Sequence, residues 1–176
     1  MIYSTGSTHL LSAILTKATG SSTLTFARSA LGAPLGITFG AWTRDPQGIY
    51  LGGNEMAMRP RDLLRIGEMY LNGGRHNGQQ VVSEGWVRAS LEARTVSRRS
   101  SDRHYGYGWW IRTLADRPVF YAWGYGGQFL FLVPSLRTVV VVTSVSEPGS
   151  ERREHLGAVY DLVERHIIPV AATASD

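Results

Sequence analysis

The chain has 176 residues, of which 43% are hydrophobic and 18% are charged, a composition that suits one globular domain. It contains no cysteine, which excludes disulfide bonds and thiolate metal sites. No apolar run approaches the roughly 18 residues that a membrane-spanning helix needs, and we find no signal-peptide pattern at the start. The formal net charge is +4, and 17 of the 18 basic residues are arginine.

The first third of the chain predicts two helices and then an irregular segment. After an opening turn at residues 3–6, apolar residues recur at helical spacing up to Gly20, a residue suited to a helix C-cap: Leu10, Leu11, Ile14 and Leu15. Ser22 or Thr23 would cap a second, short helix that reaches Leu31. Residues 32–58 are rich in glycine and hold no period, so we expect an irregular excursion over the surface.

The strongest helical pattern covers residues 59–71. Pro60 suits the first turn, Asp62 favours the positive end of the helix dipole, and Asn72-Gly73-Gly74 ends the pattern. A further helix is expected over residues 83–91, with four residues facing inward: Trp86, Val87, Ser90 and Leu91.

The rest of the chain predicts an antiparallel sheet covered by a final helix. A polar loop is expected at residues 94–104 and a strand at 105–111, in which Trp109 and Trp110 would point to opposite faces. Residues 119–133 predict two strand segments broken near the glycines, followed by a strand at 138–144. The short connections indicate a meander, and residues 151–168 form an amphipathic pattern that would cover one face.

The stretch YAWGYGGQFLFLVP at residues 121–134 stands at the centre of this pattern. Glycines alternate with aromatic residues and lead into a continuous apolar run, which is typical of a strand buried on both faces. Glycines at the head of a strand let a ligand or another backbone approach closely. One interpretation is therefore a cleft wall; a bulge or tight corner without a ligand accounts for the residues equally well.

Several segments, in this order, resemble the serine β-lactamase-like hydrolases: YSTGSTHLLSAILTKATG, MAMRPRDLLRIGEMYLNGG, NGQQVVSEGWV, YGYGWW and AWGYGGQFLFLVP. That family includes class C β-lactamases, penicillin-binding proteins and 6-aminohexanoate-dimer hydrolases, and the last are similar in GGQ before the final strands. The resemblance implies an α/β (α+β) fold, with an antiparallel sheet flanked by helices.

The resemblance also implies site residues. In the family a tyrosine of a Tyr-x-Asn or Tyr-x-Ser motif assists proton transfer, and Tyr3-Ser4-Thr5 occupies that motif with threonine last. Ala122-Trp123-Gly124 occupies the family's Lys/His-x-Gly motif without its basic residue, which favours amidase or esterase activity over β-lactam carboxylate binding. Tyr3 would be catalytic, and the backbone N–H of Tyr125 would form half of an oxyanion hole. The residues that would bind substrate are Thr5, Trp123, Gly124 and Gly126.

The family's nucleophile motif, Ser-x-x-Lys, does not occur in the chain. Its single lysine is Lys17, and position 14 is Ile14. We therefore expect residues 1–176 to be the C-terminal portion of a single hydrolase domain that lacks the N-terminal strands and helix. Because a serine hydroxyl needs a neighbouring base, such a portion should be inactive alone. The alternative is a non-catalytic remnant that binds a ligand or peptide.

Other functional classes receive less support. The five histidines are scattered and none accompanies a Gly-x-Ser-x-Gly elbow, so neither a metal site, a cofactor nor a separate triad is expected. Five arginines lie near a serine-rich loop without interleaved aromatic residues, which favours a solvated loop over nucleic-acid binding: Arg88, Arg94, Arg98, Arg99 and Arg103. The expected partner is a small amide, ester or β-lactam, with self-association through an exposed sheet edge. The pattern does not decide the compartment.

Overall fold

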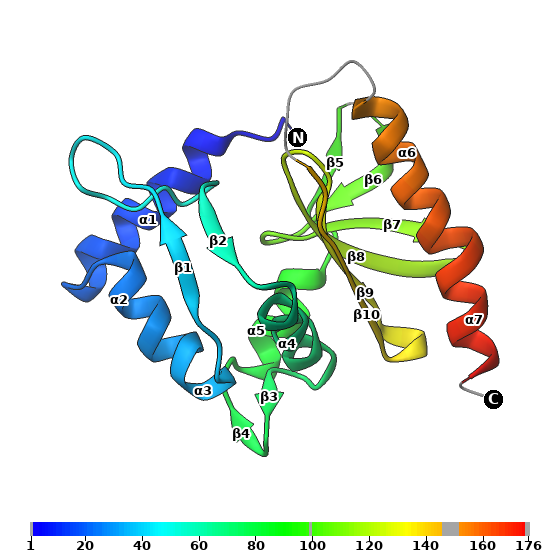
Figure 1. The fold of residues 1–176 in the computed structure, drawn as a ribbon, viewed down its shortest axis with the longest axis horizontal. Helices are drawn as coiled ribbons and strands as arrows, with labels where there is room; N and C mark the ends of the chain where they lie inside the picture. Colours follow the sequence, from blue (N-terminus) through cyan, green and yellow to red (C-terminus); the bar gives the residue numbers. More distant parts are fainter. Residues whose placement is uncertain (1, 99, 146–151, 175–176) are drawn as a thin grey trace.

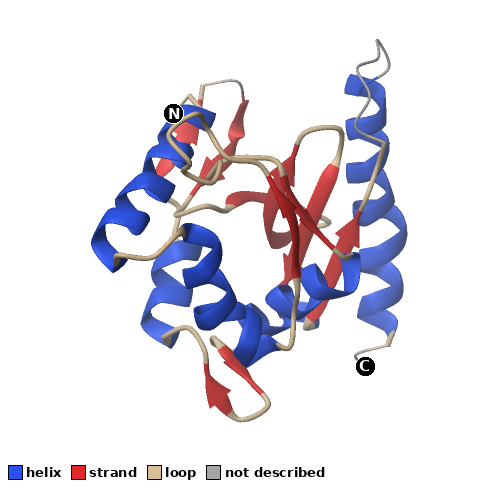
Figure 2. Cartoon of the chain, turned by 60° about the vertical axis from the view of Figure 1, so that its left-hand side comes forward, coloured by secondary structure: helices blue, strands red, loops and turns tan. Residues whose placement is uncertain are grey.

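The computed structural model describes residues 2–98, 100–145 and 152–174. Figure 1 shows α1–α3 and the β1–β2 hairpin on one side, a large sheet in the middle, and α6–α7 on the other side. Figure 2, turned by 60°, shows the C-terminal helix again lying along the sheet, apart from the N-terminal helices. None of the described helices is long and apolar enough to cross a membrane.

The N-terminal helices form where the sequence predicts them. Helix α1 (Thr5–Thr19) is capped by the Ser4 side chain, which accepts a hydrogen bond from the Ser7 N–H, and it ends at Gly20 with φ of 66°. The expected turn at residues 3–6 is wrong in part, because Thr5 and Gly6 already belong to this helix. Helix α2 (Thr23–Ala27) has Ser22 as its N-cap and continues through a π-helical turn (Arg28–Gly32) into α3 (Ala33–Leu35).

The glycine-rich segment that we expected to be irregular contains a small antiparallel sheet. Strand β1 (Phe39–Trp42) pairs with β2 (Met56–Met58), and a bridge joins Arg44 to Tyr50 in the connection between them. Phe39 packs into a cluster with Leu35, Ile37 and Met69, which joins this hairpin to α3 and α4. Tertiary packing therefore gives order to a stretch that has no sequence period.

The two middle helices confirm the predicted pattern. Helix α4 (Pro60–Leu71) follows Arg59 as N-cap, and α5 (Glu84–Leu91) is capped by the Ser83 side chain. A hairpin that the sequence did not predict, β3 (Arg75–His76) with β4 (Gln79–Gln80), lies between them. The inward orientation predicted for Trp86 is wrong: its side chain is 49% exposed and stacks on the Tyr107 ring, with centroids 5.6 Å apart.

The large sheet is the predicted antiparallel meander, with spatial order β10-β9-β8-β7-β6-β5. Its strands are β5 (Thr95–Ser97), β6 (Ser100–Tyr105), β7 (Trp110–Leu114), β8 (Arg117–Gly124), β9 (Gln128–Val133) and β10 (Thr138–Val142). The predicted loop at 94–104 is wrong, because it contributes β5 and most of β6. The predicted strand at 105–111 is wrong in part: Tyr105 ends β6 and Trp110 begins β7, but residues 106–109 lie between these strands.

Helices cover the two faces of this sheet, so β9 is buried on both sides as predicted. Leu130 and Leu132 pack with Trp109 against apolar residues of α4. Phe129 and Phe131 face the other way, toward Val159, Val163 and Ile168 of the C-terminal helix. Trp109 and Trp110 belong to these two opposite clusters, which confirms that they point to opposite faces.

The C-terminal helix is longer than the pattern predicted. Helix α6 (Arg152–Leu162) passes through a π-helical turn (Val163–Ile167) into α7 (Ile168–Thr173). Pro169 lies in the first turn of α7, where a missing N–H is tolerated. Leu162 belongs to the apolar residues of the amphipathic pattern at 151–168, so we expected it to face the sheet, but it is 45% exposed.

Candidate active site

Tyr3 lies against the sheet. Its ring centroid is 6.4 Å from that of Tyr105 at the end of β6 and 6.1 Å from that of Trp110 at the start of β7. The side chain remains 43% exposed. Tyr3 thus has one side packed on aromatic rings and another open to solvent.

A row of aromatic rings continues from Tyr3 to the glycine-rich end of β8. The Trp110 and Trp123 centroids are 6.3 Å apart, and Trp123 stacks on Phe129 with centroids 6.2 Å apart and an interplanar angle of 6°. The indole N–H of Trp123 is buried and has no hydrogen-bond partner within the described residues. Such a donor is costly to leave unpaired, and it lies next to Gly124, the last residue of β8.

Residues 124–127 form a tight turn between β8 and β9, which we call the glycine turn. The Gly127 N–H donates to the Gly124 carbonyl at 3.4 Å, and Gly126 has φ of 79°. A positive φ at the third residue is the signature of a type II turn and explains glycine at that position. Tyr125, the second residue, has a side chain that is 52% exposed.

Thr5, the third residue of the predicted tyrosine motif, lies beside the hairpin connection between β1 and β2. A Cβ added to Gly53 would be 2.8 Å from Thr5 Cγ2, and one added to Gly52 would be 2.4 Å from the Thr8 carbonyl oxygen. This connection therefore presses its backbone against the first turns of α1. Paired glycines in the sequence were the only signal of this contact.

Hydrogen bonds complete the anchoring of α1. His9 Nε2 lies 2.9 Å from Asp45 Oδ2, and the Ser12 hydroxyl donates to the Tyr50 carbonyl at 2.7 Å. Burial raises the pKa of Asp45, but hydrogen bonds from the Ile49 N–H and from His9 lower it more, so that the net pKa lies below the usual value. The segment carrying Tyr3 is thus held by a connection about forty residues further along the chain.

Burial perturbs two tyrosines of the large sheet, of which Tyr105 lies beside Tyr3. Burial raises the pKa of Tyr105, and the adjacent Tyr3 raises it further. Burial also raises the pKa of Tyr121, strongly. Both phenols therefore stay neutral at ordinary pH and act in packing or as hydrogen-bond donors rather than as bases.

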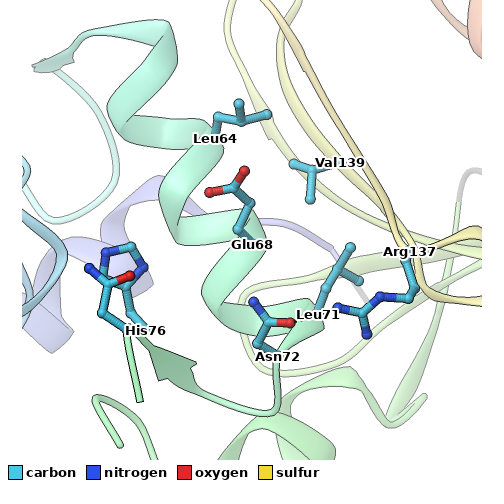
Figure 3. A pocket seen from close by; sticks show the side chains of 8 residues that line it. Leu64, Glu68, Leu71, Asn72, His76, Arg137 and Val139 are labelled. Atoms are coloured by element: carbon cyan, nitrogen blue, oxygen red, sulfur yellow. Dashed lines mark hydrogen bonds between the residues drawn. The ribbon is translucent and has the colours of Figure 1, made fainter. Parts of the chain in front are cut away.

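One cavity lies away from these residues. It has a volume of about 480 Å³ and lies between the end of α4 and the start of β10, lined among others by Glu68, His76 and Arg137. Figure 3 shows these side chains around the opening. None of the predicted site residues lines it. In the described part of the chain, no cluster of histidine and acidic side chains could hold a metal ion.

Comparison with known proteins identifies the family. The sequence model of the Beta-lactamase family matches residues 1–164. A 6-aminohexanoate-dimer hydrolase of Paenarthrobacter ureafaciens is 34% identical over 123 residues, which cover 65% of this chain and 31% of that relative.

Solved structures show the same fold. A candidate 6-aminohexanoate-dimer hydrolase from Bacillus anthracis superposes with a TM-score of 0.83 at 22% identity, covering 99% of this chain and 44% of the other. A class C β-lactamase from Rhodobacter sphaeroides gives a TM-score of 0.69 at 20% identity, covering 94% of this chain and 60% of the other. This chain spans less than two thirds of the length of each of these relatives. On the family match and the shared fold, the chain belongs to the serine β-lactamase-like family.

Proposed function

We propose that this chain carries the proton-transfer and oxyanion-binding part of a serine hydrolase that cleaves an amide, ester or β-lactam through an acyl-serine intermediate. Tyr3 would pass the proton between the attacking serine and the leaving group. The Tyr125 N–H would donate to the oxyanion, and four residues would contact the substrate: Thr5, Trp123, Gly124 and Gly126. Because Ala122 stands where the family has a basic residue, an uncharged amide or ester is the favoured substrate class.

The observation that carries this proposal is the aromatic row between Tyr3 and Trp123. Through Trp110, it links the third residue of the chain to the strand that leads into the glycine turn. These two segments are about 120 positions apart in the sequence, so their approach is a property of the fold. A phenol that passes a proton and an N–H that binds an oxyanion are the groups that acyl transfer uses beside its nucleophile, and the aromatic row joins the segments that would carry them.

Residues 1–176 contain no Ser-x-x-Lys, so the chain alone should not turn over an ester. The test is incubation with a nitrophenyl ester and, separately, with a fluorophosphonate probe, followed by intact-mass spectrometry. We expect neither release of nitrophenol above background nor a mass increase. Covalent labelling of any serine would show that the chain has its own nucleophile and would overturn this part of the proposal.

Binding tests the site without needing turnover. A short linear amide should quench tryptophan fluorescence, and Tyr3→Phe should weaken its binding about fivefold, as expected for one lost hydrogen bond. Trp123→Phe should remove much of the signal, whereas the control Trp86→Phe, at an exposed tryptophan of α5, should preserve the dissociation constant. Saturable binding whose dissociation constant is the same in the Tyr3 and Trp123 variants would favour the alternative, a ligand- or peptide-binding module.

The arginines near residues 88–103 and the edge strand β10 are the two features that concern nucleic-acid binding and self-association. The arginines near residues 88–103 include Arg88, 3.9 Å from Glu84, and Arg94, 2.5 Å from Glu92. This local pairing supports a solvated surface rather than a nucleic-acid site. Strand β10, in contrast, pairs only with β9 among the described residues, and we propose that its free edge supports self-association.

A further inference from the structure

The side chain of Gln128, the first residue of β9, reaches across to Ser144, two residues beyond the end of β10. Its Nε2 donates to the Ser144 carbonyl at 2.5 Å, and the Ser144 N–H donates to its Oε1 at 3.1 Å. The last backbone pair of these two strands is Val142 with Phe129. The Gln128 amide therefore extends the ladder by one pair, directly beside the glycine turn.

The Ser144 hydroxyl joins the turn to the C-terminal helix. It donates to the Gly127 carbonyl at 3.0 Å and lies 2.9 Å from His155 Nε2 on α6. A hydroxyl has a single hydrogen, so when it is given to Gly127 the histidine must be the donor in the second bond. His155 thus carries its proton on Nε2 in this arrangement.

Gly127 leaves no free space between these groups and the turn. A Cβ at this position would lie 2.9 Å from His155 Nε2 and 3.1 Å from Ser144 Oγ, and φ of Gly127 is 97°. The serine and histidine therefore pack directly against the backbone of the turn. A shift of the turn toward them is blocked, and a shift away breaks the Ser144–Gly127 bond.

We propose that Gln128, Ser144 and His155 act as a brace that fixes the glycine turn and so positions the Tyr125 N–H. This inference rests on the proposed function, in which that N–H binds an oxyanion. A donor stabilises developing charge only if it is held in place before the reaction, so groups that immobilise the turn contribute without touching substrate. All three are positioning residues, and the sequence pattern identified none of them as part of the site.

Amide hydrogen exchange at residues 124–128, resolved by NMR, measures the brace directly. Gln128→Ala removes both bonds to Ser144, and we expect exchange of the Gly127 amide to accelerate roughly tenfold. His155→Ala should accelerate it about threefold, and His155→Gln, which restores an N–H donor at similar reach, should return it toward the original rate. The control is Gln80→Ala, which removes a glutamine whose Nε2 donates to the Gly73 and Val82 carbonyls in the β3–β4 hairpin.

The outcomes separate the brace from the oxyanion role. Unchanged exchange at the turn in both alanine variants would overturn the brace, as would equal acceleration in β7 and β8, which would mean global destabilisation. If the turn loosens but the amide ligand binds as before, the brace stands and the role of the Tyr125 N–H fails. Acceleration confined to the turn, with rescue by His155→Gln and no effect of Gln80→Ala, supports the brace.

Discussion

Gly52 packs so closely against α1 that its replacement by alanine should lower the free energy of unfolding. An alanine Cβ at Gly52 would lie 2.4 Å from the Thr8 carbonyl oxygen and 2.9 Å from Ser12 Cβ. Ordinary contact begins near 3.4 Å, so the helix and the connection must separate by about 1 Å. The φ of Gly52 does not lie in the left-handed region, and the effect is therefore one of space.

Gly52→Ala should cost about 1–3 kcal/mol of unfolding free energy, the range found for overpacked sites, or a fall in Tm of roughly 2–12 °C for a chain of this size. The assay is urea denaturation followed by circular dichroism, with Gly85→Ala as the matched control. Gly85 lies in α5 with no atom within 4 Å of an added Cβ, so alanine there should stabilise by up to about 1 kcal/mol. A Gly52→Ala variant as stable as the parent would refute the reasoning.

Three other changes test the anchoring, the charges and the free edge. Ser12→Ala should destabilise by about 1–3 kcal/mol in the same denaturation assay, because the buried Tyr50 carbonyl loses the hydroxyl that donates to it. Hydrogen bonds from Arg59 lower the pKa of Asp62, whose side chain is buried. The ionised carboxylate should therefore add to the free energy of unfolding fully above about pH 5, and this stabilisation should be lost as the pH falls below about 4. Asp62→Asn should make stability depend less on pH in this acid range. Thr138→Lys at the start of β10, at a half-buried polar position, should reduce concentration-dependent association in sedimentation velocity, since a charge on an edge strand disfavours pairing with another chain. Equal association of variant and parent would exclude this edge.

The helices were predictable because their signals are local. Ser22 and Ser83 cap helices where the sequence places them, and Pro60 and Gly20 mark a start and an end. The prediction that Trp86 faces inward was wrong because helical periodicity carries no information about a partner on another segment. Its partner, Tyr107, lies in the connection between β6 and β7, and the two rings cover each other at the surface.

The strands between residues 94 and 105 were not predictable from their own residues. This stretch is polar, and its order comes from pairing: Val96 opposes His104, and His104 opposes Ile111 of β7. The same holds for β1 and β2, which pair across a connection of more than ten residues. Local propensity is weak in such segments, so long-range hydrogen bonding decides their structure.

For the candidate site, the sequence supplied residues but not their surroundings. The family resemblance predicted Tyr3 and Tyr125 as site residues, which stays a prediction, and the structure shows what packs around the segments that contain them. The connection containing Gly52 and Gly53 packs on α1 and so fixes the helix that follows Tyr3, and Gln128 with its partners fixes the turn that contains Tyr125. A site built from two distant segments needs both anchors, because movement of either one changes the distance between the phenol and the N–H.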